Sequence, residues 1–369
     1  MKKINFFNTY ISPSAADSVQ HVLQTGFLSE GKVVAEFEAG LTKEAGIVNP
    51  VALNSGTAAL HLALVVAGIG EGDEVIIPAQ TFIATGLAVL MTGAKPVFAD
   101  IQYETGNISP ADVIKKISVR TKAIMPVHWG GYPCDMDELQ VIATNNNLLL
   151  IDDAAHAIGA TYKNQKIGSI GDMSCFSFQA IKHLTTGDGG ALGCKSFQHY
   201  KKAMSLRWFG IDRQNSPVGL LGEREYNLQK TGYKYHLNNY AAALGMANLN
   251  DLETNLKRRR EIASYYHEEL RGVTGIIKFK YQQDRKSAYW LYGFHVENRE
   301  AFILKLKQTG IPASVVHLGI HKNDIFTHYS KETLTTQYDF DKTQIHIPVH
   351  NDLDDEQIQF IITTIKGGW

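Results

Sequence analysis

The sequence is poor in the features that mark several classes of protein. It holds three cysteines in 369 residues, and none of them forms a C-x-x-C pair. This argues against a disulfide framework, a cysteine-ligated metal site and an iron–sulfur cluster. The formal net charge of −1 leaves no excess of positive charge to bind nucleic acid or a membrane surface. The most apolar run, near Ala58–Gly70, is too short to span a bilayer and contains His61.

Internal repeats and low-complexity segments are also missing. The first ten residues carry two lysines but not the apolar core of a secretion signal. A hydrophobic content of 44% is typical of a globular protein, and we expect a soluble, cytoplasmic one. The length exceeds that of a usual single core, so two domains are expected.

What the sequence does contain is a long alternation of strand and helix patterns. Residues 13–46 predict one or two helices interrupted at Gly26–Gly31. The alternation that follows predicts an α/β fold whose mostly parallel sheet is covered by helices on both faces. Ligands bind such sheets at the carboxyl ends of the strands. The predicted strands are Val51–Leu53, Glu74–Ile77, Pro96–Asp100, Ala123–Val127, Leu148–Ile151, Asp172–Phe178 and Gly190–Gly193.

Small polar residues follow the first of these strands. The run Asn54-Ser55-Gly56-Thr57 separates the strand from a helix that ends at Gly68. Free backbone N–H groups and the helix dipole at such a turn bind anions, and Ser55 and Thr57 add hydroxyl donors. The pattern therefore predicts a phosphate site, with an ordinary helix N-cap as the alternative.

The segment 177–190, SFQAIKHLTTGDGG, carries the most chemistry. Lys182 comes just after an apolar strand, and apolar surroundings lower the pKa of a lysine and prepare it for Schiff-base formation. Gly187, Gly189 and Gly190 let the backbone approach a bound group closely. A surface lysine in a loop is the alternative for this stretch alone.

Several candidate residues fall together at strand ends. A lysine can form an imine, an aspartate can pair with a protonated ring nitrogen, an aromatic ring can stack on a flat ring, and a helix start can hold phosphate. Pyridoxal 5′-phosphate (PLP) needs all four. Taken singly, Phe82, Asp153 and His156 are more often structural, so the prediction rests on the combination. The residues at or just past strand ends are Gly56, Thr57, Phe82, Asp153, Ser177 and Lys182.

Six motifs, taken in order, resemble those of the DegT/DnrJ/EryC1/StrS sugar aminotransferases, of the aspartate aminotransferase fold type. The resemblance covers nearly the whole chain. The motifs are NSGTAALHLAL at 54–64, PAQTF at 78–82, DDAAHAIGA at 152–160, SFQAIKHLTTGDGG at 177–190, GYKYHLNNYAAALG at 232–245 and IHIPVH at 345–350.

The resemblance implies two domains. A large PLP-binding domain over 1–252 would contain a mostly parallel seven-stranded sheet between helices. A smaller α+β domain would cover 253–369, and the N-terminal residues are candidates to pack on it. Within the second domain the patterns predict helices and a strand at Asn255–Leu270, Trp290–Val296, Arg299–Gln308 and Asp354–Ile365. The basic run 257–260 of the first helix is expected to be a solvated face.

The resemblance also implies roles for single residues. Lys182 matches the lysine that binds PLP and moves the proton between the amine-bearing carbon and the cofactor. Asp153 matches the partner of the pyridine nitrogen, Phe82 the aromatic residue stacked on the ring, and His156 a residue beside the phenolic oxygen.

The phosphate group of the cofactor has its own implied partners. Gly56, Thr57 and Ser177 match phosphate-binding positions. Asn238 matches a residue that reaches the phosphate from the other subunit, which implies a homodimer with shared active sites.

The family also contains dehydratases in which the cofactor lysine is a histidine. Here the S-F-x-x-x-K spacing puts Lys182, rather than His183, at that position, which favours a transaminase. The resemblance departs at two positions: the family usually has glutamate where Asp188 stands and commonly where Asp152 stands, and both aspartates keep the charge. The resemblance implies L-glutamate as amino donor and a nucleotide-linked keto sugar as acceptor, in the synthesis of polysaccharide or antibiotic sugars.

Other functions stay open at this point. The acceptor is alternatively a small phosphorylated ketone, a ketosugar acid or a keto-cyclitol. A PLP-dependent dehydratase and a non-catalytic regulatory protein are less favoured.

Residues that would bind the substrate are harder to identify. Arg207 and Arg213 are candidates to bind a carboxylate or phosphate, and structural ion pairs are the equal alternative. His317 and His321 lie where the small domain of the family meets the cleft. A surface loop is the slightly favoured alternative for these histidines.

Overall fold

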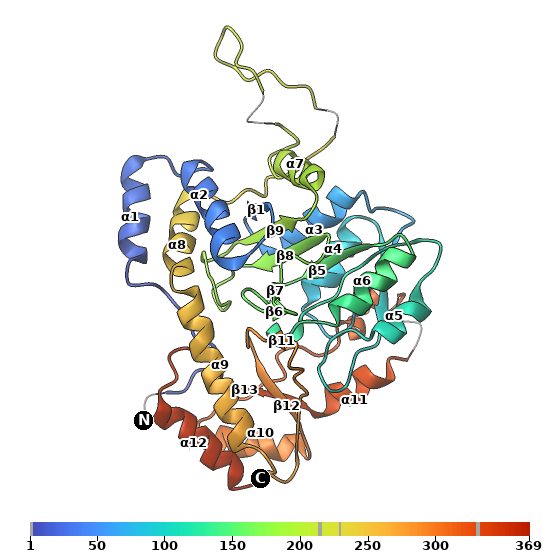
Figure 1. Ribbon diagram of the computed structural model, residues 1–369, viewed down its shortest axis with the longest axis vertical. Coiled ribbons are helices and arrows are strands. Elements are labelled where there is room, and N and C mark those ends of the chain that lie inside the picture. Colours follow the sequence, from blue (N-terminus) through green and yellow to red (C-terminus); the bar gives the residue numbers. More distant parts are fainter. Residues whose placement is uncertain (1–2, 213–215, 229, 330–332) are drawn as a thin grey trace.

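A computed structural model describes residues 3–212, 216–228, 230–329 and 333–369. Within them, a central sheet of seven strands has the order β1-β9-β8-β5-β4-β2-β3 (Figure 1). Neighbouring strands from β3 to β8 are parallel, and β9 is antiparallel to both β8 and β1. The strands are β1 (Pro50–Leu53), β2 (Glu74–Pro78), β3 (Lys95–Ala99), β4 (Thr121–Ile124), β5 (Leu149–Asp153), β8 (Met173–Ser177) and β9 (Gly190–Cys194). The predicted mostly parallel sheet is confirmed.

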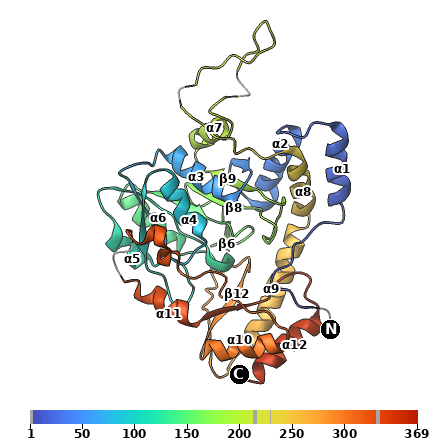
Figure 2. The ribbon, with the colours of Figure 1, turned by 180° about the vertical axis from the view of Figure 1, so that it is seen from behind.

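The sheet is apolar on both faces because its side chains alternate between two cores. Ile76 of β2 and Leu150 of β5 pack into one core, while Ile77 and Ile151, their neighbours in sequence, pack into the other. Helices α5 and α6 cover the first face and α3 and α4 the second (Figures 1 and 2). These helices are α3 (Gly56–Ala67), α4 (Ile83–Met91), α5 (Pro110–Lys116) and α6 (Met136–Asn145). Burial on both faces explains why the strands are continuous apolar runs.

Strand β4 ends earlier than predicted. β4 ends at Ile124, whereas the apolar pattern continues to Val127. Pro126 lies in this stretch and has no N–H group to donate to a neighbouring strand. Val127 keeps only an isolated bridge to Asp153, so the chain still passes beside the end of β5.

The N-terminal helices pack at one end of the sheet. Helix α1 (Ala15–Thr25) lies along α8 (Asn239–Leu249), and α2 (Lys32–Gly40) begins after the interruption that the glycines predict (Figure 1). Gly26 ends α1 with φ 69°, a backbone conformation that glycine adopts readily. A helix also follows β9, α7 (Phe197–Leu206).

The C-terminal part forms a second, smaller layer of strands and helices. A three-stranded antiparallel sheet has the order β10-β12-β13. Ile4 packs into its core, so the N-terminal segment lies against this part of the chain. Its main elements are α9 (Leu252–Glu269), β10 (Ile276–Lys278), β12 (Tyr292–Val296), α10 (Arg299–Gln308), β13 (Gln344–Ile347) and α12 (Asp355–Lys366).

The basic run on α9 is not the solvated face that we expected. The guanidinium group of Arg259 is buried and donates to the carbonyl oxygen of Val349 at 2.7 Å. Arg260 donates to the carbonyl oxygen of Gly159 at 2.8 Å. The helix is therefore tied to both parts of the chain by arginines that bind backbone carbonyls.

Two smaller sets of elements complete the description. Strands β6 (Thr161–Tyr162), β7 (Gln165–Lys166) and β11 (Arg285–Lys286) pair into a small sheet, and α11 (Thr335–Thr343) precedes β13. Among the helices of the described ranges, none combines the length and apolarity that crossing a membrane requires.

Candidate active site

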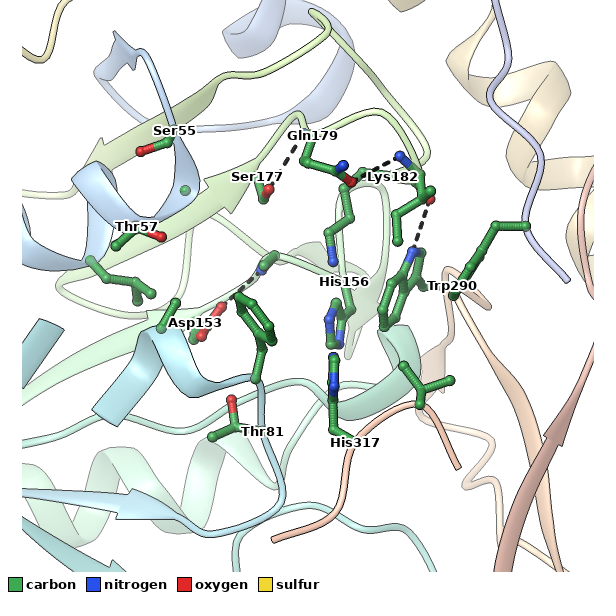
Figure 3. A pocket seen from close by; sticks show the side chains of 18 of the residues that line it. Ser55, Thr57, Thr81, Asp153, His156, Ser177, Gln179, Lys182, Trp290 and His317 are labelled. Carbon is green, nitrogen blue, oxygen red and sulfur yellow. Dashed lines mark hydrogen bonds between the residues drawn. The ribbon is translucent and has the colours of Figure 1, made fainter. Parts of the chain in front are cut away.

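A cavity of about 550 Å³ opens at the carboxyl ends of the central strands. Its walls come from the start of α3, the loop after β2, the ends of β5 and β8, and the loop that carries Lys182 (Figure 3). Residues of the N-terminal segment and of the C-terminal part close its far side. The cavity thus lies where a parallel α/β sheet is expected to bind a ligand.

One side of the cavity is built to hold an anion. Ser55 caps α3, because its hydroxyl oxygen accepts from the backbone N–H of Ala58 at 3.0 Å. The next residue is a glycine because a Cβ on Gly56 would lie 2.8 Å from the Cβ of Ser177. The hydroxyl-bearing residues Thr57 and Ser177 line the cavity at this end (Figure 3). A helix N-terminus with hydroxyl donors and a close backbone approach fits a phosphate group.

A buried carboxylate lies beside this anion site. Asp153 ends β5, and its two oxygens accept from the Thr85 hydroxyl at 2.7 Å and from the Ala155 N–H at 3.1 Å. Burial raises the pKa of Asp153, while these two hydrogen bonds and Lys182 act in the opposite direction. The carboxylate is therefore held in one orientation toward the cavity, where it can pair with a protonated ring nitrogen.

The loop after β8 presents Lys182 to the same cavity. Two backbone hydrogen bonds close this loop. The N–H of Phe178 donates to the carbonyl oxygen of Gly189, and the N–H of Thr186 donates to that of Phe178. The side chain of Lys182 extends from the loop toward Asp153 and His156 (Figure 3). Burial lowers the pKa of Lys182 to about 7, and the charge of Asp153 opposes that shift. A sizeable share of the amine is therefore neutral near pH 7 and able to act as a nucleophile or base.

Two further side chains of the cavity offer contacts to a flat ring. His156 is buried, and burial lowers its pKa well below the ordinary value of a histidine. Its Nδ1 atom has no hydrogen-bond partner among the described residues. Phe82 begins α4 and keeps 50% of its surface exposed at the cavity wall. A flat ring with a hydrogen-bonding oxygen would satisfy the histidine and cover the phenyl ring. These observations fit the PLP that the sequence predicts.

Most of the predicted residues meet in this one cavity. Its lining includes Gly56, Thr57, Phe82, Asp153, His156, Ser177, Lys182 and His317. His317 lies in a loop, but this loop borders the cavity, and the ring of His317 is 5.1 Å from that of Phe82. Its binding of substrate stays a prediction. Burial is the main cause that lowers the pKa of His317 to about 4, so its imidazole is neutral at pH 7.

Arg207 is not a substrate-binding residue of this cavity. It is buried, and its guanidinium group binds Glu38 at 2.5 Å and Glu30 at 2.8 Å. The structure thus agrees with the alternative of a structural ion pair, because Arg207 is absent from the described cavity lining and pairs with Glu38 of α2 and with Glu30 just before that helix. Arg213 lies outside the described residues.

His321 and Asn238 are also missing from the described lining of the cavity. The backbone N–H of Ile320 binds the carbonyl of Ala79, and the short turn that follows places the ring of His321 against Phe98. The prediction that His321 binds substrate is therefore not supported within this chain. Asn238 caps α8, since its side chain accepts from the Ala241 N–H at 2.9 Å.

The aromatic wall of the cavity was not predicted from the sequence. Phe6, Phe7 and Trp290 line it, and the Trp290 ring lies 3.8 Å from that of His156. No local motif marks these residues, because they come from chain segments far from Lys182. The paired aromatics in the N-terminal run NFFNTY were the only signal available.

Comparisons with known proteins agree with this geometry. The model of the DegT/DnrJ/EryC1/StrS aminotransferase family matches residues 10–366. GDP-perosamine synthase of Caulobacter vibrioides is 33% identical and covers 95% of this chain and 94% of its own. The crystal structure of the sugar aminotransferase CalS13 from Micromonospora echinospora matches with a TM-score of 0.94 at 33% identity, over 99% of this chain and 100% of that one.

A further solved structure concerns the cofactor. Spr1654 from Streptococcus pneumoniae has been solved in a PMP form, which matches with a TM-score of 0.91 at 30% identity over 99% of this chain and 98% of that one. A PLP form of the same protein matches with a TM-score of 0.90. The family model and these full-length similarities lead to one conclusion: the chain belongs to the DegT/DnrJ/EryC1/StrS aminotransferase family.

Proposed function

We propose that this protein is a PLP-dependent aminotransferase that moves the amino group of L-glutamate to the keto group of a nucleotide-linked sugar. One observation carries the proposal. A buried lysine with a lowered pKa shares a cavity with a fixed carboxylate and with a helix N-terminus suited to phosphate. Few cofactors other than PLP need all three groups in one place.

Each residue has a task in this proposal. Gly56, Thr57 and Ser177 hold the phosphate at the start of α3. Asp153 keeps the pyridine nitrogen protonated, and His156 donates to or accepts from the ring oxygen. Bound in this way, PLP supplies an electron sink for the carbon that bears the amine. Phe82 packs on the ring and excludes water from its face.

Lys182 carries the proton. With a pKa of about 7, its amine takes a proton from the amine-bearing carbon and returns one without leaving the cavity. The same residue would act in both half-reactions, first with L-glutamate and then with the keto acceptor. Asp153 limits the fall of the lysine pKa, so the ammonium form remains accessible.

The acceptor is the finer part of the proposal. The Caulobacter relative is a GDP-perosamine synthase, and a Campylobacter jejuni relative that is 33% identical is named for a UDP-linked amino sugar. Both names favour a nucleotide-linked sugar. A panel of acceptors would test this: nucleotide-linked keto sugars, a small phosphorylated ketone, a ketosugar acid and a keto-cyclitol, each incubated with L-glutamate and the enzyme. We expect an aminated product, seen by mass spectrometry, only from the first group, and amination of another group alone would overturn this choice.

We further propose a homodimer in which Asn238 reaches the phosphate of the partner's site. Within one chain this residue caps α8 and is absent from the described cavity lining. The segment 216–228 projects from the body, and Leu220 and Leu221 at its end are almost fully exposed, as expected for a surface that another copy covers (Figure 1).

A complementation experiment tests the shared site. Lys182→Ala and Asn238→Ala are each expected to be impaired alone. A hybrid dimer that contains one copy of each variant would own one site with both native residues, so we expect up to half of the normal activity to return. Hybrid dimers no more active than the parents would contradict a shared site.

A further inference from the structure

Trp290 is tied to the loop that carries Lys182, although more than a hundred residues separate them in the sequence. Its side chain is 1% exposed, and its Nε1–H donates to the carbonyl oxygen of Ile181 at 3.0 Å. Tyr289, just before it, has φ 49°, a conformation that residues other than glycine seldom adopt. This backbone conformation lies just before β12, and the indole that follows it lines the cavity.

The indole also contacts the amine of Lys182. The Nζ atom lies 3.7 Å from the centroid of a Trp290 ring, within the range of a cation–π interaction. Within the described ranges, the ammonium group has no ion pair or hydrogen bond to a carboxylate. Figure 3 shows Lys182 and His156 on the same side of the indole, and the His156 ring stacks on it at 3.8 Å with an interplanar angle of 15°.

The N-terminal segment supports the indole. The Phe7 ring stacks on Trp290 with centroids 5.2 Å apart and an interplanar angle of 21°. Phe6 packs edge-on against Phe7 at 4.7 Å. The segment is held in place because the Asn5 carbonyl is hydrogen-bonded to the His350 ring at 3.0 Å. Phe7 thus contacts the indole ring that in turn contacts the Lys182 amine.

We propose that Trp290 is a positioning residue for Lys182: its indole face binds the ammonium form and keeps the amine in the cavity, and Phe7 keeps the indole in place. The contact between the Lys182 amine and the indole is formed by residues of the chain alone and does not involve the cofactor. Only its meaning for catalysis rests on the proposed function.

The proposal gives a direction for the pKa of Lys182. The titratable groups that act on this amine are Asp153, His156, His183 and His317, and Asp188 lines the same cavity. The three histidines have their pKa values lowered by burial and are neutral near pH 7. Asp153 is the carboxylate whose charge raises the pKa of Lys182, and the indole face contacts the amine directly. Removing the aromatic face should therefore lower the pKa of Lys182 further below its value of about 7.

The pKa can be measured in the PLP-free protein by competitive labelling. The protein is treated with acetic anhydride over a range of pH, and modification of the peptide that contains Lys182 is followed by mass spectrometry. Trp290→Phe keeps an aromatic face, whereas Trp290→Leu fills a similar space without one. Trp369→Leu is the control, because Trp369 packs on Phe302 in the C-terminal part.

We expect Trp290→Leu to lower the midpoint by about one pH unit relative to Trp290→Phe, a change of roughly tenfold in acid dissociation. Phe7→Leu should produce a smaller fall in the same direction, and Trp369→Leu should leave the midpoint unchanged. Equal midpoints for the Phe and Leu variants at 290 would overturn the proposal, as would an equal fall in the Trp369 control.

Two further readouts separate this result from a failure to fold or to transaminate. Thermal unfolding of each variant shows whether the labelled protein is native at the temperature used. Because neither PLP nor a substrate is present, the midpoint difference is expected even if the protein proves not to be an aminotransferase. In the holoenzyme, the proposal adds that the acid limb of the kcat profile moves to lower pH in Trp290→Leu but not in Trp290→Phe.

Discussion

The surroundings of two buried basic residues, Lys182 and Arg207, shift their pKa values in opposite directions. Arg207 donates to Glu38, Glu30 and the carbonyl oxygen of Ala52, so its charge is balanced by two carboxylates. Burial lowers the pKa of Arg207, but the two glutamates raise it by more, and the guanidinium remains charged. Lys182 has one carboxylate nearby and an indole face, and burial dominates its pKa. A buried cation with satisfied partners is structural, whereas one that is left short of partners in a cavity is available for chemistry.

Removing the Lys182 amine should have the largest effect on activity. We expect Lys182→Ala to lose at least ~10³-fold in kcat, since the proton at the amine-bearing carbon would have no carrier. The variant should remain folded, because a buried amine without an ion pair contributes little to stability. Steady-state kinetics and thermal unfolding would be measured on the same preparation. Turnover near that of the wild type would contradict the assignment of Lys182 to the chemistry.

Arg207 should show the reverse pattern. Arg207→Met would leave Glu38 and Glu30 without their cation, and breaking such a pair costs about 3–5 kcal/mol of unfolding free energy. We expect urea denaturation to show this loss, while the variant that remains folded keeps a KM close to that of the wild type. A stable variant with a strongly raised KM would instead make Arg207 a substrate ligand.

Asp153 tests how far the electron sink depends on a fixed carboxylate. Asp153→Asn keeps the shape and the hydrogen bonds but cannot hold the ring nitrogen protonated. A fall in kcat of roughly 100-fold is expected, with PLP still bound. Absorption spectroscopy of the purified variant checks the cofactor, and kinetics check the rate. Unchanged kinetics would remove Asp153 from its proposed role.

The lowered pKa of Lys182 also makes the free energy of unfolding depend on pH. Its pKa is about 7 in the folded PLP-free protein and ~10.4 in the unfolded chain, so between these values the unfolded state binds more protons. Stability should therefore rise with pH in this window, by at most about 1.4 kcal/mol per pH unit. Denaturant unfolding of the PLP-free protein from pH 7 to 10, with Lys182→Met as control, measures the difference. Identical slopes for the two proteins would show that the amine is not held below its usual pKa.

The sequence predicted the parts of the site that lie in continuous motifs. Asp153 ends a strand of the central sheet, and Gly56 and Lys182 follow two others. Parallel strands bring such ends to one edge of the sheet. The end of β4 was misplaced by a few residues because the apolar pattern hides the effect of Pro126. The fold was thus accessible from periodicity and from the family resemblance.

The aromatic side of the cavity was not accessible in the same way. Trp290 and Phe7 reach Lys182 only through tertiary packing, and nothing in their local sequence specifies a contact with a residue so distant. Arg207 posed the opposite problem, since arginine near aromatics fits both an ion pair and a ligand site. Only the positions of Glu30 and Glu38 decide between them.

The most direct test of the account is the absorption spectrum of the purified protein with PLP, recorded before and after L-glutamate is added. We predict a visible band from the cofactor bound to Lys182, which gives way to the near-ultraviolet band of the amine form. The Lys182→Ala variant should lack the first band. A protein that shows no such band even with added PLP would contradict the central claim that this cavity and its lysine bind the cofactor.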